Sequence, residues 1–319
     1  MSGVVGEEVA LLLREAGVDS KVLDSSSCGG GSIADVRRLR LADGRTVVVK
    51  ISRRLACGPN HLESRVHEEA AGLAAIGSTG TIPVPEVVGI GESGGIVMLV
   101  LEDLGDSIRA SPSDWVDFGI RLADLHASNG TSTFGFDHDN HLGDTSQDNS
   151  PSSDPSSWST FLSERRLSPM QRRLQQAGLL DSIDEDLLAR LVEDLPALLP
   201  EGIQPGLLHG DLWSGNVLPT QDRGITMIDP AVFHGDPLFE LGMMRLFGGF
   251  SSECENAYFD RLVEIRGADV LDASEIRIEL GRLHHLLNHW LTFGPSYGHA
   301  ARQVASSLVS MVSRGGGAG

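Results

Sequence analysis

The first hundred residues carry short apolar runs separated by turn residues, a pattern typical of β-strands. The pair Asp43-Gly44 stands between two such runs and indicates a hairpin. We expect a mostly antiparallel sheet with one inserted helix. The predicted elements are a helix over 4–16, three strands between 22 and 51, a helix over 60–76, and strands over 86–91 and 96–101.

Helical spacing of apolar positions dominates after Leu104-Gly105. Residues 137–157 are the exception, because they are rich in Ser and Asp, contain prolines and predict a polar functional loop or lid. We therefore predict an α+β protein with a sheet-rich lobe over 1–103 and a mainly helical lobe over 104–319. The predicted helices of the second lobe cover 114–127, 158–176, 183–198, 237–247, 253–266, 273–292 and 298–313.

The composition is that of an ordinary globular protein, with 40% hydrophobic and 22% charged residues. A net charge of −19 argues against binding to nucleic acid or an anionic membrane, since both need a positive surface. The same charge suits a cationic substrate, although an acidic surface also serves solubility. The three cysteines are too scattered for a disulfide framework or a zinc site. With no leader and no apolar run of about twenty residues, we expect a cytoplasmic protein.

One segment concentrates polar residues of catalytic types: His209-Gly-Asp-Leu-Trp-Ser-Gly-Asn216, followed later by Ile228-Asp-Pro230. Protein kinases use an Asp, an Asn and a second Asp in this order, the first to accept the hydroxyl proton and the others to bind Mg²⁺. We predict that Asp211 is the general base and that Asn216 and Asp229 bind Mg²⁺, which prefers hard oxygen ligands. Asp and Asn in loops are otherwise turn formers, but the complete ordered set argues against that explanation.

Lys50 is one of only two lysines among 25 basic residues, and it closes the third predicted strand. In kinases a strand Lys contacts the phosphates and is held by a helix Glu. Glu69 interrupts the apolar stripe of the 60–76 helix, where an inward carboxylate needs a cation. We predict that Lys50 pairs with Glu69, with Glu68 as the second choice. An ordinary strand-end lysine and a glutamate that reaches water at the stripe's edge remain alternatives.

Two further segments suit a nucleotide. Gly30, Gly31 and Ser32 lie in a turn between the first two strands, where backbone amides can approach phosphates. The turn does not match Gly-x-Gly-x-x-Gly, so any tight turn explains it equally well. The run Glu102, Asp103, Leu104 ends a strand where a kinase hinge offers backbone groups to adenine, although a plain strand end also fits.

Aromatic and imidazole rings are candidates to line an acceptor site, because flat rings pack on sugar faces; they are Trp213, His285, His289 and Trp290. The two histidines are four residues apart and also suit a metal, but no third ligand lies nearby. Trp290 continues an apolar stripe and is equally a core residue. Asp236 precedes Pro237, so we expect it to cap the next helix or brace the catalytic loop.

With these residues in view, the chain resembles the fructosamine kinase (ketosamine kinase) family, within the aminoglycoside phosphotransferase-like group of protein-kinase-like fold. The resemblance runs from about Gly30 to about Tyr297. The wider group shares His-Gly-Asp and Asp-Pro. Trp213 and the segment Phe247-Gly-Gly-Phe-Ser251 point to the ketosamine branch.

The resemblance implies ATP and Mg²⁺ as cofactors, a nucleotide-binding lobe over 1–103 and a catalytic, substrate-binding lobe over 104–319. It implies phosphate positioning by Lys50 and Glu69 and phosphorylation of a sugar hydroxyl of a ketoamine. Such a ketoamine is a fructosamine or ribulosamine on lysine or a protein amine, and its phosphorylated adduct becomes unstable, which removes the sugar. We expect a monomer without nucleic-acid or membrane partners.

Two other functions compete with this one. An aminoglycoside or other small-molecule phosphotransferase of the same fold would also suit the acidic balance of the chain. A pseudokinase that binds nucleotide and regulates a partner is the non-enzyme alternative. The presence of all five expected polar residues argues against the pseudokinase; they are Lys50, Glu69, Asp211, Asn216 and Asp229.

Overall fold

The computed structural model divides into two compact units. The first comprises Met1–Ala110 and Gly215–Pro230, and the second comprises Ser111–Ser214 and Ala231–Gly319. The segment 215–230 thus belongs to the first unit by its packing, whereas the sequence pattern assigned everything after residue 103 to a second lobe. The functional roles of the two lobes stay predictions. The structure describes residues 4–28, 35–53, 61–128 and 131–315.

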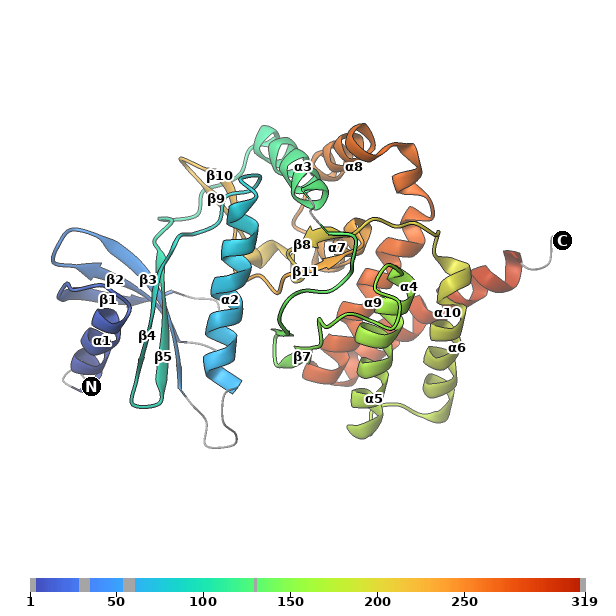
Figure 1. Cartoon of the computed structure of the whole chain (residues 1–319), viewed down its shortest axis with the longest axis horizontal. Helices are drawn as coiled ribbons and strands as arrows, with labels where there is room; N and C mark the ends of the chain where they lie inside the picture. Colours follow the sequence, from blue (N-terminus) through green and yellow to red (C-terminus); the bar gives the residue numbers. More distant parts are fainter. Residues whose placement is uncertain (1–3, 29–34, 54–60, 129–130, 316–319) are drawn as a thin grey trace. The chain divides into compact units, whose positions relative to one another are not determined.

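The first unit is built on a five-stranded sheet with the order β1-β2-β3-β5-β4, in which every neighbouring pair is antiparallel (Figure 1). The predicted antiparallel sheet is therefore confirmed. Lys50 lies inside the third strand, not at its end. The strands are β1 Val22–Ser27, β2 Asp35–Leu41, β3 Thr46–Arg53, β4 Val87–Ser93 and β5 Ile96–Glu102.

Two helices cover the two faces of this sheet (Figure 1). α1 (Val4–Glu15) packs on the face to which Met98 and Val100 point, and α2 (His61–Ser78) packs on the face of Leu99. The alternation of side chains along β5 explains why this strand is apolar throughout, since both of its faces are buried.

A hairpin from the middle of the chain completes the first unit. β9 (Val217–Thr220) pairs with β10 (Gly224–Met227). Backbone hydrogen bonds tie the hairpin to residues of the first unit: Ile108 N–H donates to Pro219 O at 2.9 Å, and Met227 N–H donates to Pro83 O at 3.0 Å.

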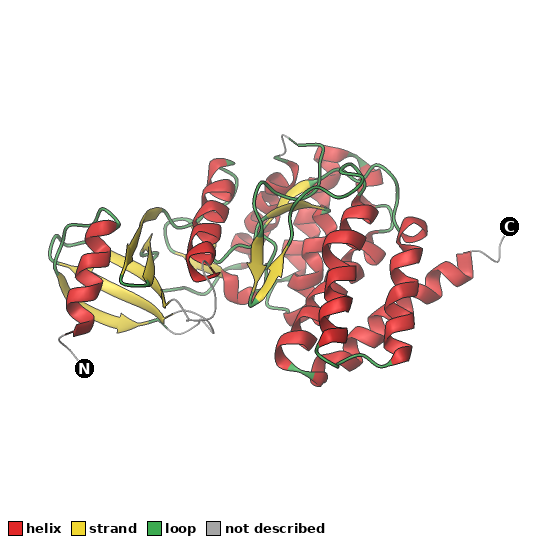
Figure 2. Ribbon diagram, turned by 60° about the horizontal axis from the view of Figure 1, so that its bottom comes forward, coloured by secondary structure: helices red, strands yellow, loops and turns green. Residues whose placement is uncertain are grey.

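The second unit is mainly helical, as predicted (Figure 2). α3 packs against α8, α7 against α9, and α10 against both α6 and α9. The predicted helix over 158–176 is divided by a π-helical stretch at Leu162–Leu167. The α-helices are α3 Pro112–Ala127, α4 Trp158–Phe161, α5 Ser168–Gln176, α6 Ser182–Leu198, α7 Pro237–Phe247, α8 Ser252–Arg266, α9 Ser274–Phe293 and α10 Gly298–Gly315. Two short antiparallel pairs accompany them, β6 (Asn140–Leu142) with β7 (Thr145–Gln147) and β8 (Gly206–Leu208) with β11 (Phe233–Gly235).

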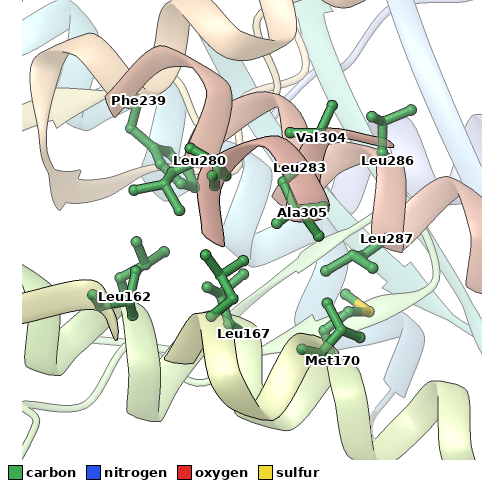
Figure 3. Close-up of a cluster of buried hydrophobic side chains, with 14 of the residues drawn as sticks. Leu162, Leu167, Met170, Phe239, Leu280, Leu283, Leu286, Leu287, Val304 and Ala305 are labelled. Atoms are coloured by element: carbon green, nitrogen blue, oxygen red, sulfur yellow. The ribbon is translucent and has the colours of Figure 1, made fainter. Parts of the chain in front are cut away.

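Apolar side chains from α9 and α10 meet those of the π-helix and α5 in the core of the second unit (Figure 3). Leu162, Leu167 and Met170 come from one side, while Leu283 and Leu287 come from α9. All five are at most 3% exposed. Burial of such side chains stabilises the unit by roughly 1.5–3 kcal/mol each.

The Ser/Asp-rich segment 137–157 is exposed at many positions but also lies partly in the interior, which its polar composition did not predict; its role as a functional loop or lid stays a prediction. It contains the β6–β7 hairpin, and Asn149 is fully buried. Asn149 Oδ1 accepts a hydrogen bond from Arg166 at 2.6 Å, and Asn140 Nδ2 donates to Val232 O at 2.7 Å. Asn140 and Asn149 form part of the interior because each finds a hydrogen-bond partner, which hydrophobic periodicity does not reveal.

Within the described residues, no helix has the length and apolar character needed to cross a membrane.

Candidate active site

The β9–β10 hairpin brings Asn216 beside the segment that carries Asp229. Val217 and Met227 are paired across the hairpin, and the Ile228 N–H then donates to Asn216 O at 3.0 Å. Asn216 therefore precedes β9 and Asp229 follows β10 at the same, open end of the ladder. An antiparallel register thus unites two residues that are thirteen positions apart in the sequence.

Asp229 has a left-handed backbone conformation, with φ of 56°. Among residues with side chains this region is costly, and Asp and Asn tolerate it best. Strained backbone of this kind concentrates at functional sites, where the surrounding structure enforces it. The following Pro230 fixes the chain as it leaves this turn.

Lys50 connects two carboxylates within the first unit. Its ammonium lies 2.6 Å from Glu69 Oε1 and also contacts Asp229 Oδ1. The predicted ion pair with Glu69 is confirmed. Burial alone lowers the pKa of Lys50, but the two carboxylates outweigh it and the pKa is raised. Burial raises the pKa of Glu69 to about 7, with Lys50 opposing the shift.

The oxygen donors of this cluster suit Mg²⁺. The Asp229 carboxylate and the Asn216 side-chain amide are hard oxygen ligands, and Mg²⁺ is commonly held by one or two such groups together with substrate phosphates. The part of the chain that the structure describes holds no group of three or more His, Cys, Asp or Glu residues arranged for a metal. Among these residues, His285 and His289 have no third His, Cys, Asp or Glu placed to complete a metal site. A site formed by Asn216 and Asp229 has too few such residues to form a group of this kind, so Mg²⁺ binding there stays a prediction.

In the second unit, Glu240 of α7 fixes the backbone of the His209-Gly210-Asp211 loop. Its buried carboxylate accepts hydrogen bonds from the amides of His209 at 2.6 Å and Gly210 at 2.8 Å. The His126 ring lies 3.3 Å away, nitrogen to oxygen. Burial raises the pKa of Glu240, but these donors outweigh it and the pKa is lowered. Glu240 therefore stays a carboxylate inside the protein.

Close backbone packing also shapes this loop. The Ala231 N–H donates to His209 O at 2.8 Å. Gly210 has φ of +82°, and a Cβ there would overlap the carbonyl oxygen of Ala231. Only glycine fits this position. Asp211 follows, partly exposed, with its N–H donating to His209 Nδ1 at 3.2 Å.

A row of aromatic rings starts two residues after Asp211. We call it the aromatic row: Trp213, Phe247, His289, Phe293 and Tyr297. Neighbouring ring centroids lie 5.0–6.4 Å apart. Trp213, Phe247 and Phe293 are 40%, 43% and 61% exposed, which is unusual for such large apolar groups. His289 donates from Nδ1 to His285 O at 2.8 Å, which leaves Nε2 as an acceptor.

His285 and Trp290, the other two predicted acceptor residues, are each only 2% exposed. The Arg302 guanidinium lies over the Trp290 ring at 4.6 Å. For Trp290, this burial supports the alternative that it is a core residue. Burial lowers the pKa of His285 to about 3, so its ring is neutral.

The side chains at the predicted hinge are already engaged within the protein. Arg223 donates two hydrogen bonds to the Glu102 carboxylate, at 2.9 and 2.5 Å, and Asp103 pairs with Arg38 at 3.1 Å. These side chains are not free to contact a base, and adenine recognition by the backbone of Glu102–Leu104 stays a prediction. Gly30, Gly31 and Ser32 lie outside the described residues.

Sequence analysis placed Asp236 correctly but missed Glu240. Asp236 caps α7 by accepting from Leu238 N–H at 3.0 Å, and it pairs with the buried Arg277. Glu240 could have been found by the same signal as Glu69, a carboxylate within an apolar helical run. The run around Glu240 is Leu238-Phe-Glu-Leu241.

The chain has a protein-kinase-like fold. Aminoglycoside phosphotransferase APH(4)-Ia, solved with ADP and hygromycin B, shares the fold at a TM-score of 0.60 and 18% identity, with 97% of this chain and 98% of that chain covered. A Thermobifida fusca protein, described as a candidate fructosamine-3-kinase, superposes at a TM-score of 0.80 with 30% identity, over 96% of this chain and 99% of that one.

The sequence comparisons define the family. The profile of the fructosamine kinase family matches residues 6–311. Ketosamine-3-kinase of Mus musculus is 32% identical over 93% of this chain and 98% of its own length. The chain belongs to the fructosamine kinase family, and it is a kinase.

Proposed function

We propose that this protein transfers the γ-phosphoryl group of ATP to a sugar hydroxyl of a ketoamine, a fructosamine or ribulosamine carried by lysine or a protein amine. The observation that carries the proposal is the position of Lys50 between Glu69 and Asp229. Asn216 lies directly before β9, and its backbone oxygen accepts from the Ile228 N–H next to Asp229. A charge cluster of this kind suits the phosphates of a nucleotide, where positioning and electrostatics supply most of the catalysis.

The first unit carries the groups that we assign to the nucleotide. Lys50 neutralises phosphate oxygens, and Glu69 keeps its ammonium in place. Asn216 and Asp229 would hold Mg²⁺, which supplies positive charge at the phosphates when it is bound. Adenine would meet the backbone of Glu102–Leu104. Among the described residues none accepts a hydrogen bond from the Leu104 N–H, so that donor is available to a base.

The second unit carries the groups that we assign to the acceptor. Asp211 takes the proton of the sugar hydroxyl as its oxygen bonds to the γ-phosphorus, and the bond from that phosphorus to the departing ADP oxygen breaks. A general base of this kind contributes about 10²–10⁴ in rate. The aromatic row offers Trp213 as a face for the sugar ring. The name of the murine relative suggests the hydroxyl on carbon 3.

Release of ADP, coupled to a spectroscopic readout, tests the proposal with ribulosyl-lysine, fructosyl-lysine and kanamycin as acceptors. We expect turnover with a ketoamine and none with kanamycin. Turnover with kanamycin alone would favour the alternative function, an aminoglycoside phosphotransferase. The net charge of −19 would also suit that cationic substrate.

The variant Asp211→Asn separates the base from the nucleotide site. We expect it to bind ATP normally while kcat falls at least about a hundredfold. Unchanged phosphoryl transfer would exclude Asp211 as the base.

A further inference from the structure

A small pocket opens in the second unit between the β6–β7 hairpin, the start of α5 and α9. Its volume is about 230 Å³ with the open mouth included. None of the residues that we assign to phosphoryl transfer lines it. Its polar lining includes Arg166, Arg173, His284, Gln147 and Ser146. In a chain of net charge −19, a pocket lined by arginines needs an explanation.

Arg166 is a buried cation that forms no direct ion pair in the described part of the chain, although the charges of Asp148 and Asp139 act on it from a distance. It is 2% exposed, yet its Nη1 and Nη2 donate only to neutral acceptors: the carbonyl oxygens of Asp148 and Arg165 and the side-chain amide of Asn149. Its Nε has no partner. Burial lowers the pKa of Arg166 to about 9. A buried guanidinium with no anion in direct contact is costly, so this site favours a bound anion.

Arg173 provides a second cation at the same pocket. Its Nη2 donates to Ser146 Oγ at 2.7 Å, and no carboxylate of the described residues forms an ion pair with it. Burial lowers the pKa of Arg173, and the neighbouring Arg172 lowers it further. Two unpaired guanidinium groups therefore share one pocket.

His284 completes the set of potential donors. It is 3% exposed, and its Nδ1 has no partner among the described residues. Burial lowers the pKa of His284, and the charges of Arg166 and Arg173 lower it further, so the field of both arginines reaches this ring. An anion would relieve that repulsion and accept from a protonated Nδ1.

We propose that this pocket binds a small inorganic anion, of the size of chloride, between Arg166, Arg173 and His284. Gln147 presents one unpartnered acceptor, Oε1, while its Nε2 donates to Asn140 at 3.1 Å. A water molecule that donates to that oxygen would offset its repulsion of the anion. Because only the folded chain assembles the pocket, the anion stabilises the second unit by mass action.

Two measurements on the whole chain test this site. Crystals soaked in sodium bromide should show an anomalous peak between Arg166 and His284. Thermal unfolding at constant ionic strength should shift upward as sodium chloride replaces sodium gluconate, whose anion is much larger than chloride. Sodium phosphate in the same series shows whether an oxyanion competes with the halide. An empty map at high bromide, or a water molecule only, would overturn the proposal.

A matched pair of variants separates this site from general salt effects. Arg173→Gln should weaken the apparent anion affinity about tenfold or more, because a charge-assisted hydrogen bond is lost. Arg172→Gln, at the exposed neighbouring position that does not line the pocket, should behave like the parent. An equal response of both variants to chloride would mean an adventitious ion only. Neither readout depends on phosphoryl transfer, so the outcome stands apart from the proposed function.

Discussion

Glu240 holds His209 through the backbone: its carboxylate accepts the His209 N–H at 2.6 Å and the adjacent Gly210 N–H at 2.8 Å. The carboxylate is buried, so water cannot replace it as the acceptor. The conformation of the loop that carries Asp211 therefore depends on one charge on α7.

Glu240→Gln should destabilise the protein. A glutamine keeps one oxygen, but its NH₂ group would face a backbone donor and leave a buried N–H without an acceptor. We expect the free energy of unfolding to fall by about 2–4 kcal/mol and kcat to fall with it. Urea titration measures the first quantity. Glu264→Gln, at a carboxylate that is 68% exposed, should change stability by less than about 0.5 kcal/mol. Similar losses in both variants would show that Glu240 has no special role.

The sequence predicted the elements and the Lys50–Glu69 pair because local periodicity encodes both. A carboxylate inside an apolar stripe can be recognised without a structure, and Glu240 follows the same rule. The buried contact between Asn149 and Arg166 could not be predicted in this way. It depends on which loop residues meet across the fold, and hydrogen-bond partners distant in sequence leave no periodic trace. The assignment of 215–230 to the first unit depends likewise on tertiary packing.

Lys50→Met should remove most activity while the protein stays folded. Its ammonium balances Glu69 and Asp229, and without it two carboxylates repel each other where phosphates must bind. We expect kcat/KM for ATP to fall by at least about a hundredfold. Lys21→Met is the matched control, since Lys21 is the only other lysine and is exposed. Steady-state kinetics compare the two variants, and equal effects would remove Lys50 from the site.

Gly249→Ala should disturb the catalytic loop through contact with Ser214. Gly249 has φ of +94°, and an added Cβ would overlap the Ser214 side chain. Gly248 has φ of +66° with open space around its Cβ position, so Gly248→Ala carries the backbone strain without the overlap. We expect kcat to fall further in Gly249→Ala than in Gly248→Ala.

A second substitution isolates that overlap. In the double variant Gly249→Ala/Ser214→Gly, the Ser214 side chain that the new Cβ would overlap is absent. This variant should recover part of the loss in kcat. Kinetics that do not differ between the single and the double variant would rule out the steric explanation.

Stability should fall as the pH drops below about 6.5, because His285 stays neutral when folded. Its folded pKa is about 3, while an unfolded histidine takes up a proton near 6.5. Between these values the unfolded chain binds more protons, so each pH unit of acidification costs about 1.4 kcal/mol for this residue. His285→Leu should flatten the pH profile of the unfolding free energy by about that slope. His299→Gln, at an exposed histidine, should leave the profile unchanged.

Trp213→Ala should raise KM for the ketoamine and leave KM for ATP unaltered. Trp213 is 40% exposed and contacts Phe247 at a centroid distance of 6.4 Å, so its ring is supported on one side and open to a ligand on the other. A ring contact of this kind is worth about 0.5–1.5 kcal/mol, which corresponds to roughly a two- to tenfold rise in KM. Trp115→Ala is the control, because Trp115 packs against Phe118 and Phe250 and lies outside the aromatic row. An equal rise in KM for both substrates would mean that the Trp213 ring supports the loop and does not contact the sugar. A displaced loop impairs the binding of every substrate, whereas a lost contact affects only the molecule that made it.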